Sequence, residues 1–130
     1  MPVLIVEDDP STLFVYGQQL SRAGFKVMEA SSGQHALDLL ERGVRPSVMV
    51  LDLRLPDVDG RDILTYMHDD GALREVPTVV VTALDADQAD VRADAILFKP
   101  VPQADLVGTV RRLQQSFRRA NRRRGASGPP

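Results

Sequence analysis

Acidic, hydroxyl and amine side chains stand at the ends of short apolar segments, which is where a parallel sheet gathers its functional groups. Each member of this group closes or directly follows a run of apolar residues: Glu7, Asp8, Asp52, Thr82 and Lys99. In an open parallel sheet, the ligand site lies at the carboxyl ends of the strands. If the apolar runs are parallel strands, three carboxylates, a hydroxyl and an ammonium therefore converge on one edge.

Three carboxylates in one place repel each other, and a hard divalent cation with oxygen ligands relieves that repulsion. Mg²⁺ is the natural candidate, because it keeps several waters and takes only one or two protein carboxylates. Direct binding by Asp8 and Asp52, with Glu7 acting through water, leaves room for phosphate oxygens. Thr82 and Lys99 suit the remaining oxygens of a transferred phosphoryl group. The Asp52 carboxylate is then a candidate nucleophile that forms an acyl phosphate.

Each of these residues has a simpler explanation when it is taken alone. An acid at a strand end is commonly a helix cap or part of a solvated turn, and Asp9 before Pro10 suits a cap. His35 and His68 stand alone in helical segments, so we interpret them as surface residues. The sequence has no Gly-x-Gly-x-x-Gly and no Gly-Lys-Ser/Thr motif, which excludes dinucleotide and P-loop sites. The hypothesis therefore rests on the convergence of four strand ends.

Five short apolar segments are candidates for strands that would hold these residues. They cover residues 3–6, 25–30, 47–51, 78–81 and 95–98. Several are apolar at consecutive positions, which is typical of strands covered on both faces, and most of the spacers are long enough for crossover helices. The pattern predicts an α/β fold with a five-stranded parallel sheet.

Most of the segments between these candidate strands have apolar residues at helical spacing. This spacing predicts a helix from Pro10 to a stop at Gly24, one over residues 32–42, and one that starts after Gly60. The clearest helix is C-terminal and has one apolar stripe, formed by Leu106, Val110, Leu113 and Phe117. The turn at 57–60 lacks the later ligands of a calcium loop, so we expect Gly60 to adopt a positive φ there.

The composition indicates one ordinary domain. The chain has 130 residues, 43% of them hydrophobic, and no cysteine, which excludes disulfide scaffolds, thiolate metal sites and thiol nucleophiles. No apolar stretch approaches the roughly 20 residues of a membrane span, and no basic segment leads into an apolar one at the start. We therefore expect a soluble, cytoplasmic protein with no membrane partner.

Charge is distributed unevenly along the chain although the net charge is only -2. All 18 acids lie at or before Asp105, whereas seven of the 16 basic residues, all arginines, lie between Arg111 and Arg124. A domain with this balance is an unlikely nucleic-acid binder, although its tail alone could contact phosphate backbones. The simpler interpretation of residues 120–130 is a solvated helix extension and a basic, Gly/Pro/Ser-rich linker.

Four motifs, in order, resemble the receiver domain of response regulators from two-component signalling, over Val3 to Phe117. Residues 3–10 resemble its first-strand acidic pocket, and residues 50–60 its phosphoacceptor strand and loop. Val81-Thr82-Ala83 is similar to its switch-threonine strand, and Phe98-Lys99-Pro100 to its lysine turn. The resemblance implies a doubly wound, flavodoxin-like sheet of order 2-1-3-4-5.

The resemblance also assigns roles within the acidic pocket. It implies that Asp52 is the phosphoacceptor, and that Asp8, Asp52 and the backbone carbonyl of Arg54 hold Mg²⁺. It further implies that Thr82 and Lys99 contact the phosphoryl oxygens and that the Lys99-Pro100 peptide bond is cis.

Departures from the family pattern lie in the switch region, which we place at Leu84 and Ile96. The family usually has an aromatic residue three positions before the lysine, and here that position is Ile96. Only 17 positions separate Thr82 from Lys99, which is about one helical turn fewer than the family pattern. We therefore expect the fourth helix of the family to be short or absent, and the segment from Leu84 to Asp94 to be mobile.

The sequence thus predicts a receiver domain over residues 1–119. A histidine kinase or a histidine phosphotransfer protein would donate the phosphoryl group, and an output domain or effector protein would respond. Slow self-dephosphorylation does not make it a turnover enzyme. The sequence leaves open whether the protein forms a homodimer. One alternative is an interaction module that keeps the fold and acts without phosphorylation. A small aspartate-based phosphatase is a weaker alternative, because Asp52-Leu53-Arg54 lacks a second acid two residues on.

Overall fold

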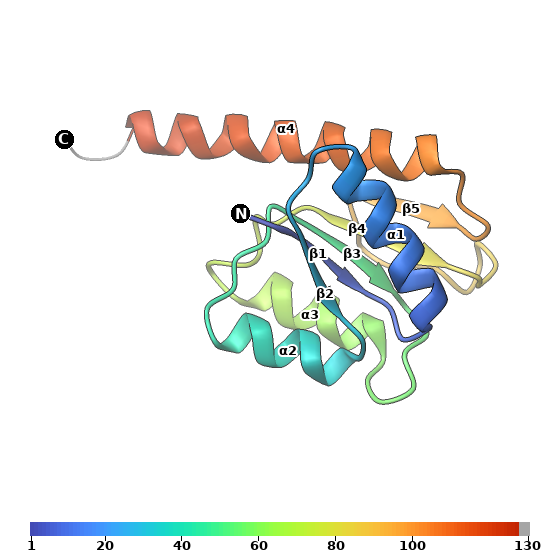
Figure 1. Cartoon of the computed structure of the whole chain (residues 1–130). Helices are drawn as coiled ribbons and strands as arrows, with labels where there is room; N and C mark the ends of the chain where they lie inside the picture. Colours follow the sequence, from blue (N-terminus) through green and yellow to red (C-terminus); the bar gives the residue numbers. More distant parts are fainter. Residues whose placement is uncertain (128–130) are drawn as a thin grey trace.

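The chain folds into a parallel β-sheet with helices on both faces (Figure 1). This computed structural model describes residues 1–127, and describes side chains as far as residue 123. The strands are β1 (Val3–Val6), β2 (Val27–Ala30), β3 (Val48–Asp52), β4 (Thr78–Thr82) and β5 (Ala95–Phe98). The helices are α1 (Pro10–Arg22), α2 (Gly33–Glu41), α3 (Gly60–Asp69) and α4 (Gln103–Ser127). The sheet has five parallel strands in the order β2-β1-β3-β4-β5, which confirms the predicted fold class.

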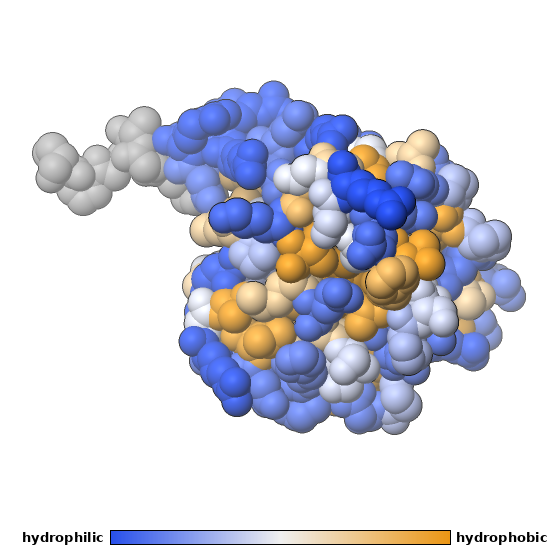
Figure 2. Space-filling view, in the orientation of Figure 1, coloured by the Kyte–Doolittle hydropathy of each residue, from blue (hydrophilic) through white to orange (hydrophobic). Residues whose placement is uncertain are grey.

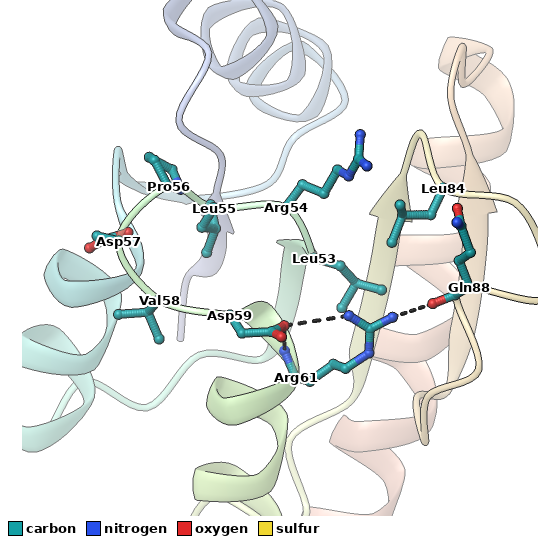
Figure 3. Close-up of a pocket in the computed structure, with 10 residues that line it drawn as sticks. All are labelled: Leu53, Arg54, Leu55, Pro56, Asp57, Val58, Asp59, Arg61, Leu84 and Gln88. Atoms are coloured by element: carbon teal, nitrogen blue, oxygen red, sulfur yellow. Dashed lines mark hydrogen bonds and ion pairs between the residues drawn. The ribbon is translucent and has the colours of Figure 1, made fainter.

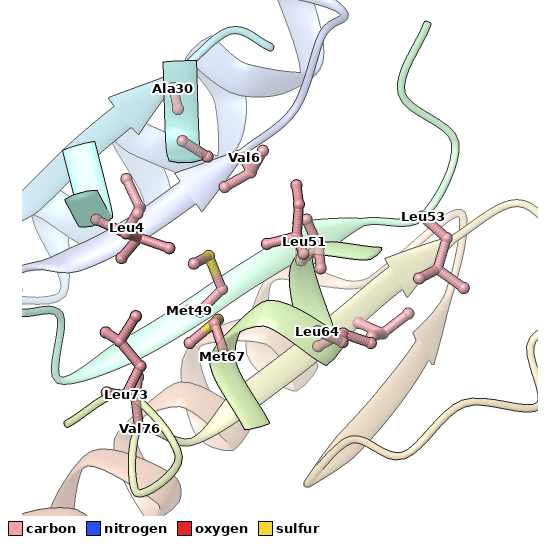
Figure 4. Close-up of a cluster of buried hydrophobic side chains, with 14 of the residues drawn as sticks. Leu4, Val6, Ala30, Met49, Leu51, Leu53, Leu64, Met67, Leu73 and Val76 are labelled. Carbon is pink, nitrogen blue, oxygen red and sulfur yellow. The ribbon is translucent and has the colours of Figure 1, made fainter. Parts of the chain in front are cut away.

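Alternate side chains of the strands enter two separate hydrophobic cores. Leu4 and Val6 of β1 contribute to the core beneath α2 and α3, which also holds Met49 and Met67 (Figure 4). The alternate residues of β1, Val3 and Ile5, contribute to the other core, beneath α1 and α4, which also holds Leu20, Leu106 and Val110. Because both faces are covered, the strands are apolar at consecutive positions, as the sequence indicated.

Local signals in the sequence account for the ends of the first helix. Asp9 is the N-cap of α1 and accepts a hydrogen bond from the Thr12 amide at 3.0 Å, and Pro10 occupies the first turn. The chain leaves the helix through Gly24 at φ 99°, a conformation that favours glycine. The expected cap role of Asp9 is confirmed, and α1 therefore starts directly beside the carboxyl end of β1.

The connection from β4 to β5, residues 83–94, contains no helix and only a turn at 86–88. We expected the fourth helix of the family to be short or absent, and it is absent from this connection. The segment still contacts the body, because Ala89 is buried in the core beneath α2 and α3. At its end, the Asp94 carboxylate accepts a hydrogen bond from the Thr78 amide at 2.8 Å. Leu84, Val91 and Ala93 also pack against this core, so the segment is held by side-chain contacts and lacks the regular hydrogen bonds of a helix.

The last helix continues well past the end of the sheet (Figure 1). Its buried positions, Leu106, Val110 and Phe117, match three of the four predicted stripe residues, and Leu113 is partly buried. The backbone stays helical to Ser127, so most of the expected tail is a helix extension, and the rest of that tail lies outside the described residues. This part of the surface is hydrophilic in Figure 2. Within residues 1–127, no helix is long and apolar enough to cross a membrane.

Candidate functional site

The carboxyl ends of two strands bring the three predicted acidic residues together. Glu7 and Asp8 follow β1, and Asp52 is the last residue of β3. One carboxylate oxygen from each of the three lies within 4.8 Å of the others. Glu7 is 2% exposed and Asp52 7% exposed, whereas Asp8 is open to solvent. The cluster is therefore a partly buried acidic pocket with one accessible carboxylate.

Lys99, which follows β5, reaches across the sheet to two of these acids. Its Nζ donates to Glu7 Oε1 at 2.7 Å and to Asp52 Oδ2 at 3.0 Å. Burial raises the pKa of Glu7, and this effect outweighs the hydrogen bond from Lys99. Burial acts against the charged form of Lys99, but its bonds to Glu7 and Asp52 prevail and raise its pKa. The ammonium thus partly balances a carboxylate pair that would otherwise repel.

Backbone contacts fix the orientation of the Asp52 carboxylate. The Arg54 amide donates to Asp52 Oδ1 at 2.9 Å, while Oδ2 accepts from Lys99. Both oxygens therefore have a donor, and the plane of the carboxylate is set by groups in the loops that follow β3 and β5. A carboxylate held in this way is oriented before any ligand arrives, which favours its use as a nucleophile or a metal ligand.

Thr82 ends β4, and its side chain is fully buried. Its hydroxyl oxygen accepts a hydrogen bond from the Leu84 amide at 3.0 Å. Its backbone carbonyl accepts from the Lys99 amide at 2.8 Å. Thr82 therefore links the Lys99 turn to the beginning of the helix-free segment.

Gly60 brings the start of α3 against the end of β3. Positive φ among the described glycines occurs at Gly24 and Gly43, so the expectation for Gly60 is wrong. The reason for glycine is steric, because a Cβ at this position would lie 2.7 Å from Leu53 Cα and 2.8 Å from the Asp52 carbonyl oxygen. This close approach holds the loop that carries Arg54 directly beside the acidic pocket.

The lysine turn and the switch positions have different surroundings. The Lys99-Pro100 peptide bond is cis, as the resemblance implied. Leu84 lies near Arg54 at the rim of a cavity of about 480 Å³ between the loop after β3 and residues 84–88 (Figure 3). Leu84 and Ile96 are both partly buried and pack against the core beneath α2 and α3. The two switch positions therefore share this core, and Leu84 also lines the cavity beside Arg54.

Sequence reasoning missed two residues that fix the loop after β3. The Asp57 carboxylate accepts hydrogen bonds from the amides of Gln34 at 2.8 Å and Gly33 at 3.1 Å, and these bonds lower its pKa. Arg61 lies 3.6 Å from Asp59 and donates to the Gln88 carbonyl, which joins α3 to the helix-free segment (Figure 3). No local signal could reveal the contacts of Asp57 with α2 or of Arg61 with Gln88, because each joins residues more than 20 positions apart.

Comparison with known proteins identifies the source of this arrangement. The model of the response regulator receiver domain family matches residues 3–111. The polar-differentiation response regulator DivK of Brucella anthropi is 29% identical over 114 residues, which cover 84% of this chain and 92% of that protein.

Solved receiver domains have the same fold. The signal receiver domain of a histidine kinase from Syntrophus aciditrophicus superposes with a TM-score of 0.83 at 26% identity, covering 91% of this chain and 92% of that one. The receiver domain of the sensor histidine kinase PA1611 from Pseudomonas aeruginosa PAO1 has a TM-score of 0.80 at 28% identity, covering 88% and 97%, and holds a magnesium ion in its active-site cleft. With this match over most of its length and this sheet order, the chain belongs to the response regulator receiver domain family.

Proposed function

We propose that this receiver accepts a phosphoryl group on Asp52 from a phosphohistidine of a histidine kinase or a histidine phosphotransfer protein. The observation that carries the proposal is the Lys99 ammonium, which donates to both Glu7 and Asp52 at the mouth of a three-carboxylate pocket. The working unit is residues 1–119. The phosphorylated state regulates an output domain or effector protein.

Mg²⁺ fits the donor set of this pocket. Asp8, Asp52 and the backbone carbonyl of Arg54 would hold it, and Glu7, buried and paired with Lys99, would act through water. These are oxygen ligands of the kind that Mg²⁺ prefers, and they leave positions for water and phosphate. The ion supplies charge neutralisation for the carboxylates and for the incoming phosphoryl oxygens.

In the transfer step, a carboxylate oxygen of Asp52 forms a bond to phosphorus while the bond from phosphorus to the donor imidazole breaks. The imidazole leaves with the electron pair of that bond. Lys99 already donates to Asp52, so it needs only to extend its hydrogen bonding to a phosphoryl oxygen. Thr82 donates its hydroxyl hydrogen to a second phosphoryl oxygen, and a shift of the hydroxyl towards that oxygen moves the Leu84 amide bonded to it.

The donor must approach close to Lys99, and an apolar surface adjoins that residue. Phe14 is 64% exposed and Val15 is 44% exposed on α1. Val15 also lines a cavity of about 520 Å³ together with Lys99 and Val101. Because this surface is continuous with the acceptor pocket, we assign it to the phosphohistidine donor.

Readout begins at the bond between Thr82 and Leu84. Movement of the Thr82 hydroxyl towards the phosphoryl group pulls on residues 83–94, since no helix stabilises them. Ile96 has no ring or hydroxyl to report the change. Hydrogen exchange with beryllofluoride and Mg²⁺ should therefore show its largest new protection between residues 83 and 94. Protection confined to other segments contradicts this readout.

Access of water to the phosphorylated Asp52 is limited by two side chains. Apolar Leu84 cannot orient an attacking water, and the long Arg54 side chain lies near it at the same rim (Figure 3). Self-dephosphorylation should therefore be slow, which suits a switch rather than a turnover enzyme. Phosphate release from Leu84→Asn and Arg54→Ala measures this, and unchanged rates in both variants remove these residues from control of access.

The decisive experiment is incubation of the whole chain with acetyl phosphate and Mg²⁺, followed by borohydride trapping and peptide mapping. The label should appear on Asp52 and be absent from Asp52→Asn. A label on Asp57 or Asp59 contradicts the assignment. No label at all, in a folded protein that binds Mg²⁺, supports the alternative of an interaction module that acts without phosphorylation, which the missing helix between β4 and β5 favours.

A further inference from the structure

The extended helix α4 carries two parallel rows of arginines on its exposed side. The rows are Arg111, Arg118 and Arg122, and Arg112, Arg119 and Arg123, all of them exposed. Within a row the spacing is seven and then four residues, so its members lie within about 20° of one line along the helix. The two rows are offset by one residue, which separates them by about 100° around the axis. The opposite side, with Val110 and Phe117, is buried against the body.

Arg111 fixes the rotation of this helix relative to the body. Its guanidinium donates to the Ala23 carbonyl at 2.8 Å and lies 5.4 Å above the centre of the Phe25 ring. Gln114, on the buried side, donates to Ser47 Oγ at 2.9 Å. These contacts are made before the helix leaves the sheet, so the direction in which the later arginines point is set by the folded domain.

The extension lacks what a helix needs to be stable by itself. Residues 118–127 contain only Arg, Ala, Asn, Gly and Ser, so no bulky apolar side chain is present to pack or to enter a bilayer. Arg118 and Arg122 are four residues apart, as are Arg119 and Arg123, and like charges at this spacing destabilise a helix. The sequence has no acid after Asp105. A partner that supplies a row of negative charges would relieve this repulsion.

We propose that the arginine rows of α4 bind the phosphate backbone of duplex DNA, with the helix lying in the major groove. That groove is about 12 Å wide and admits an α-helix. Two rows on the flanks of one helix then face the two phosphate strands that border the groove. The first and last arginines of each row are 11 positions apart, or about 16 Å along the helix, and the duplex carries one negative charge per roughly 1.7 Å of its axis. The charges on the two surfaces are complementary over this length.

The same geometry disfavours other partners and sequence-specific recognition. Duplex RNA has a deep, narrow major groove that does not admit the helix. Gln115 lies between the arginine rows, so few side chains are available to read base edges. The body carries all 18 acids against nine basic residues and repels the duplex, which confines contact to the extension. This inference does not depend on phosphorylation of Asp52.

The test is fluorescence anisotropy of a labelled random-sequence DNA duplex titrated with the whole chain over a range of salt concentrations. Binding should weaken with a log–log salt slope of about −4.5, or about 0.9 for each row arginine other than Arg111, which stays bound to Ala23 and Phe25. Arg118→Gln/Arg122→Gln should reduce the slope by about two and weaken binding. The matched control is Arg74→Gln/Arg92→Gln, which removes the same charge from exposed arginines of the body and should bind like the parent.

Several outcomes overturn the proposal. Equal weakening by both double variants means that net charge, not the arginine rows, drives binding. Tighter binding to duplex RNA contradicts insertion into the major groove. Capture by phosphatidylserine-containing vesicles, or salt-sensitive self-association, without DNA binding assigns the arginines to a membrane or a second copy. Thermal melting of each variant excludes unfolding as the cause, because the substitutions lie on exposed positions.

Discussion

The two connections that leave the carboxyl ends of β3 and β4 are built in opposite ways. The connection after β3 is short and leads directly into α3. Its Asp57 carboxylate accepts hydrogen bonds from the first amides of α2. The connection after β4 has no helix; its apolar side chains pack against the core beneath α2 and α3, and hydrogen bonds join Asp94 to Thr78 and Gln88 to Arg61. The first connection holds Asp52 in position, whereas the second lacks the regular hydrogen bonds of a helix. A fixed connection at the proposed acceptor and a helix-free connection at the proposed site of readout suit a switch.

Adding a side chain at Gly60, where α3 lies against the end of β3, should have the largest effect on stability. Gly60→Ala places a Cβ 2.7 Å from Leu53 Cα, and overpacking of this kind costs about 1–3 kcal/mol. Urea denaturation measures the loss. The control is Gly71→Ala, since a Cβ there meets nothing within 4 Å. Equal effects of the two substitutions contradict a rigid connection after β3.

Asp8→Asn tests function at the same rigid site while leaving the fold intact. The exposed Asp8 makes no contribution to either core, so the variant should fold, and relief of carboxylate repulsion should raise its melting temperature slightly. Mg²⁺ affinity and the rate of phosphorylation should both fall, by at least the tenfold or so typical of disturbed metal sites. Mg²⁺ titration and acetyl phosphate labelling measure these effects. Unchanged phosphorylation at low Mg²⁺ contradicts the assignment of Asp8 as a ligand.

Arg61→Gln should loosen the connection after β4 and leave the rest unchanged. The guanidinium contacts Asp59 and the Gln88 carbonyl, and the loss of such exposed contacts costs about 0.5–1 kcal/mol. Hydrogen exchange should accelerate in residues 83–94 and stay the same in the strands. Arg74→Gln is the control, because Arg74 is an exposed arginine outside this contact. If both variants exchange alike, Arg61 does not hold the segment.

Local patterns were enough to predict the strands, most helix ends and the pocket residues. The reason is that a parallel sheet brings strand ends together whatever the details of packing, so Glu7, Asp52 and Lys99 meet once the strands are known. The cap at Asp9 was also predictable, because its partner is Thr12, three residues away.

Contacts between distant residues were not predictable. Ser32 is a sufficient cap for α2 by itself, so nothing in the sequence indicates that Asp57 also reaches this helix. Gly60 resembles an ordinary turn glycine, and only the packing of α3 against β3 shows its steric role. The glycine and serine at the end of α4 favour a linker by composition, yet the backbone there continues the helix to Ser127.

The smallest effect concerns pH and the Asp57 cap. The hydrogen bonds from Gln34 and Gly33 lower the pKa of Asp57 below its ordinary value of 3.8. A carboxylate whose pKa is lower in the folded state stabilises the fold above its unfolded pKa, and this contribution is lost as the pH falls through the folded value. Asp57→Asn should therefore lower the melting temperature slightly at neutral pH and flatten its decline below about pH 4. Asp69→Asn, at an exposed carboxylate of α3 outside the loop after β3, should leave the acid limb unchanged. If the two variants have the same pH profile, the cap does not fix the loop beside the acceptor, and the contrast between the two connections must rest on Gly60 alone.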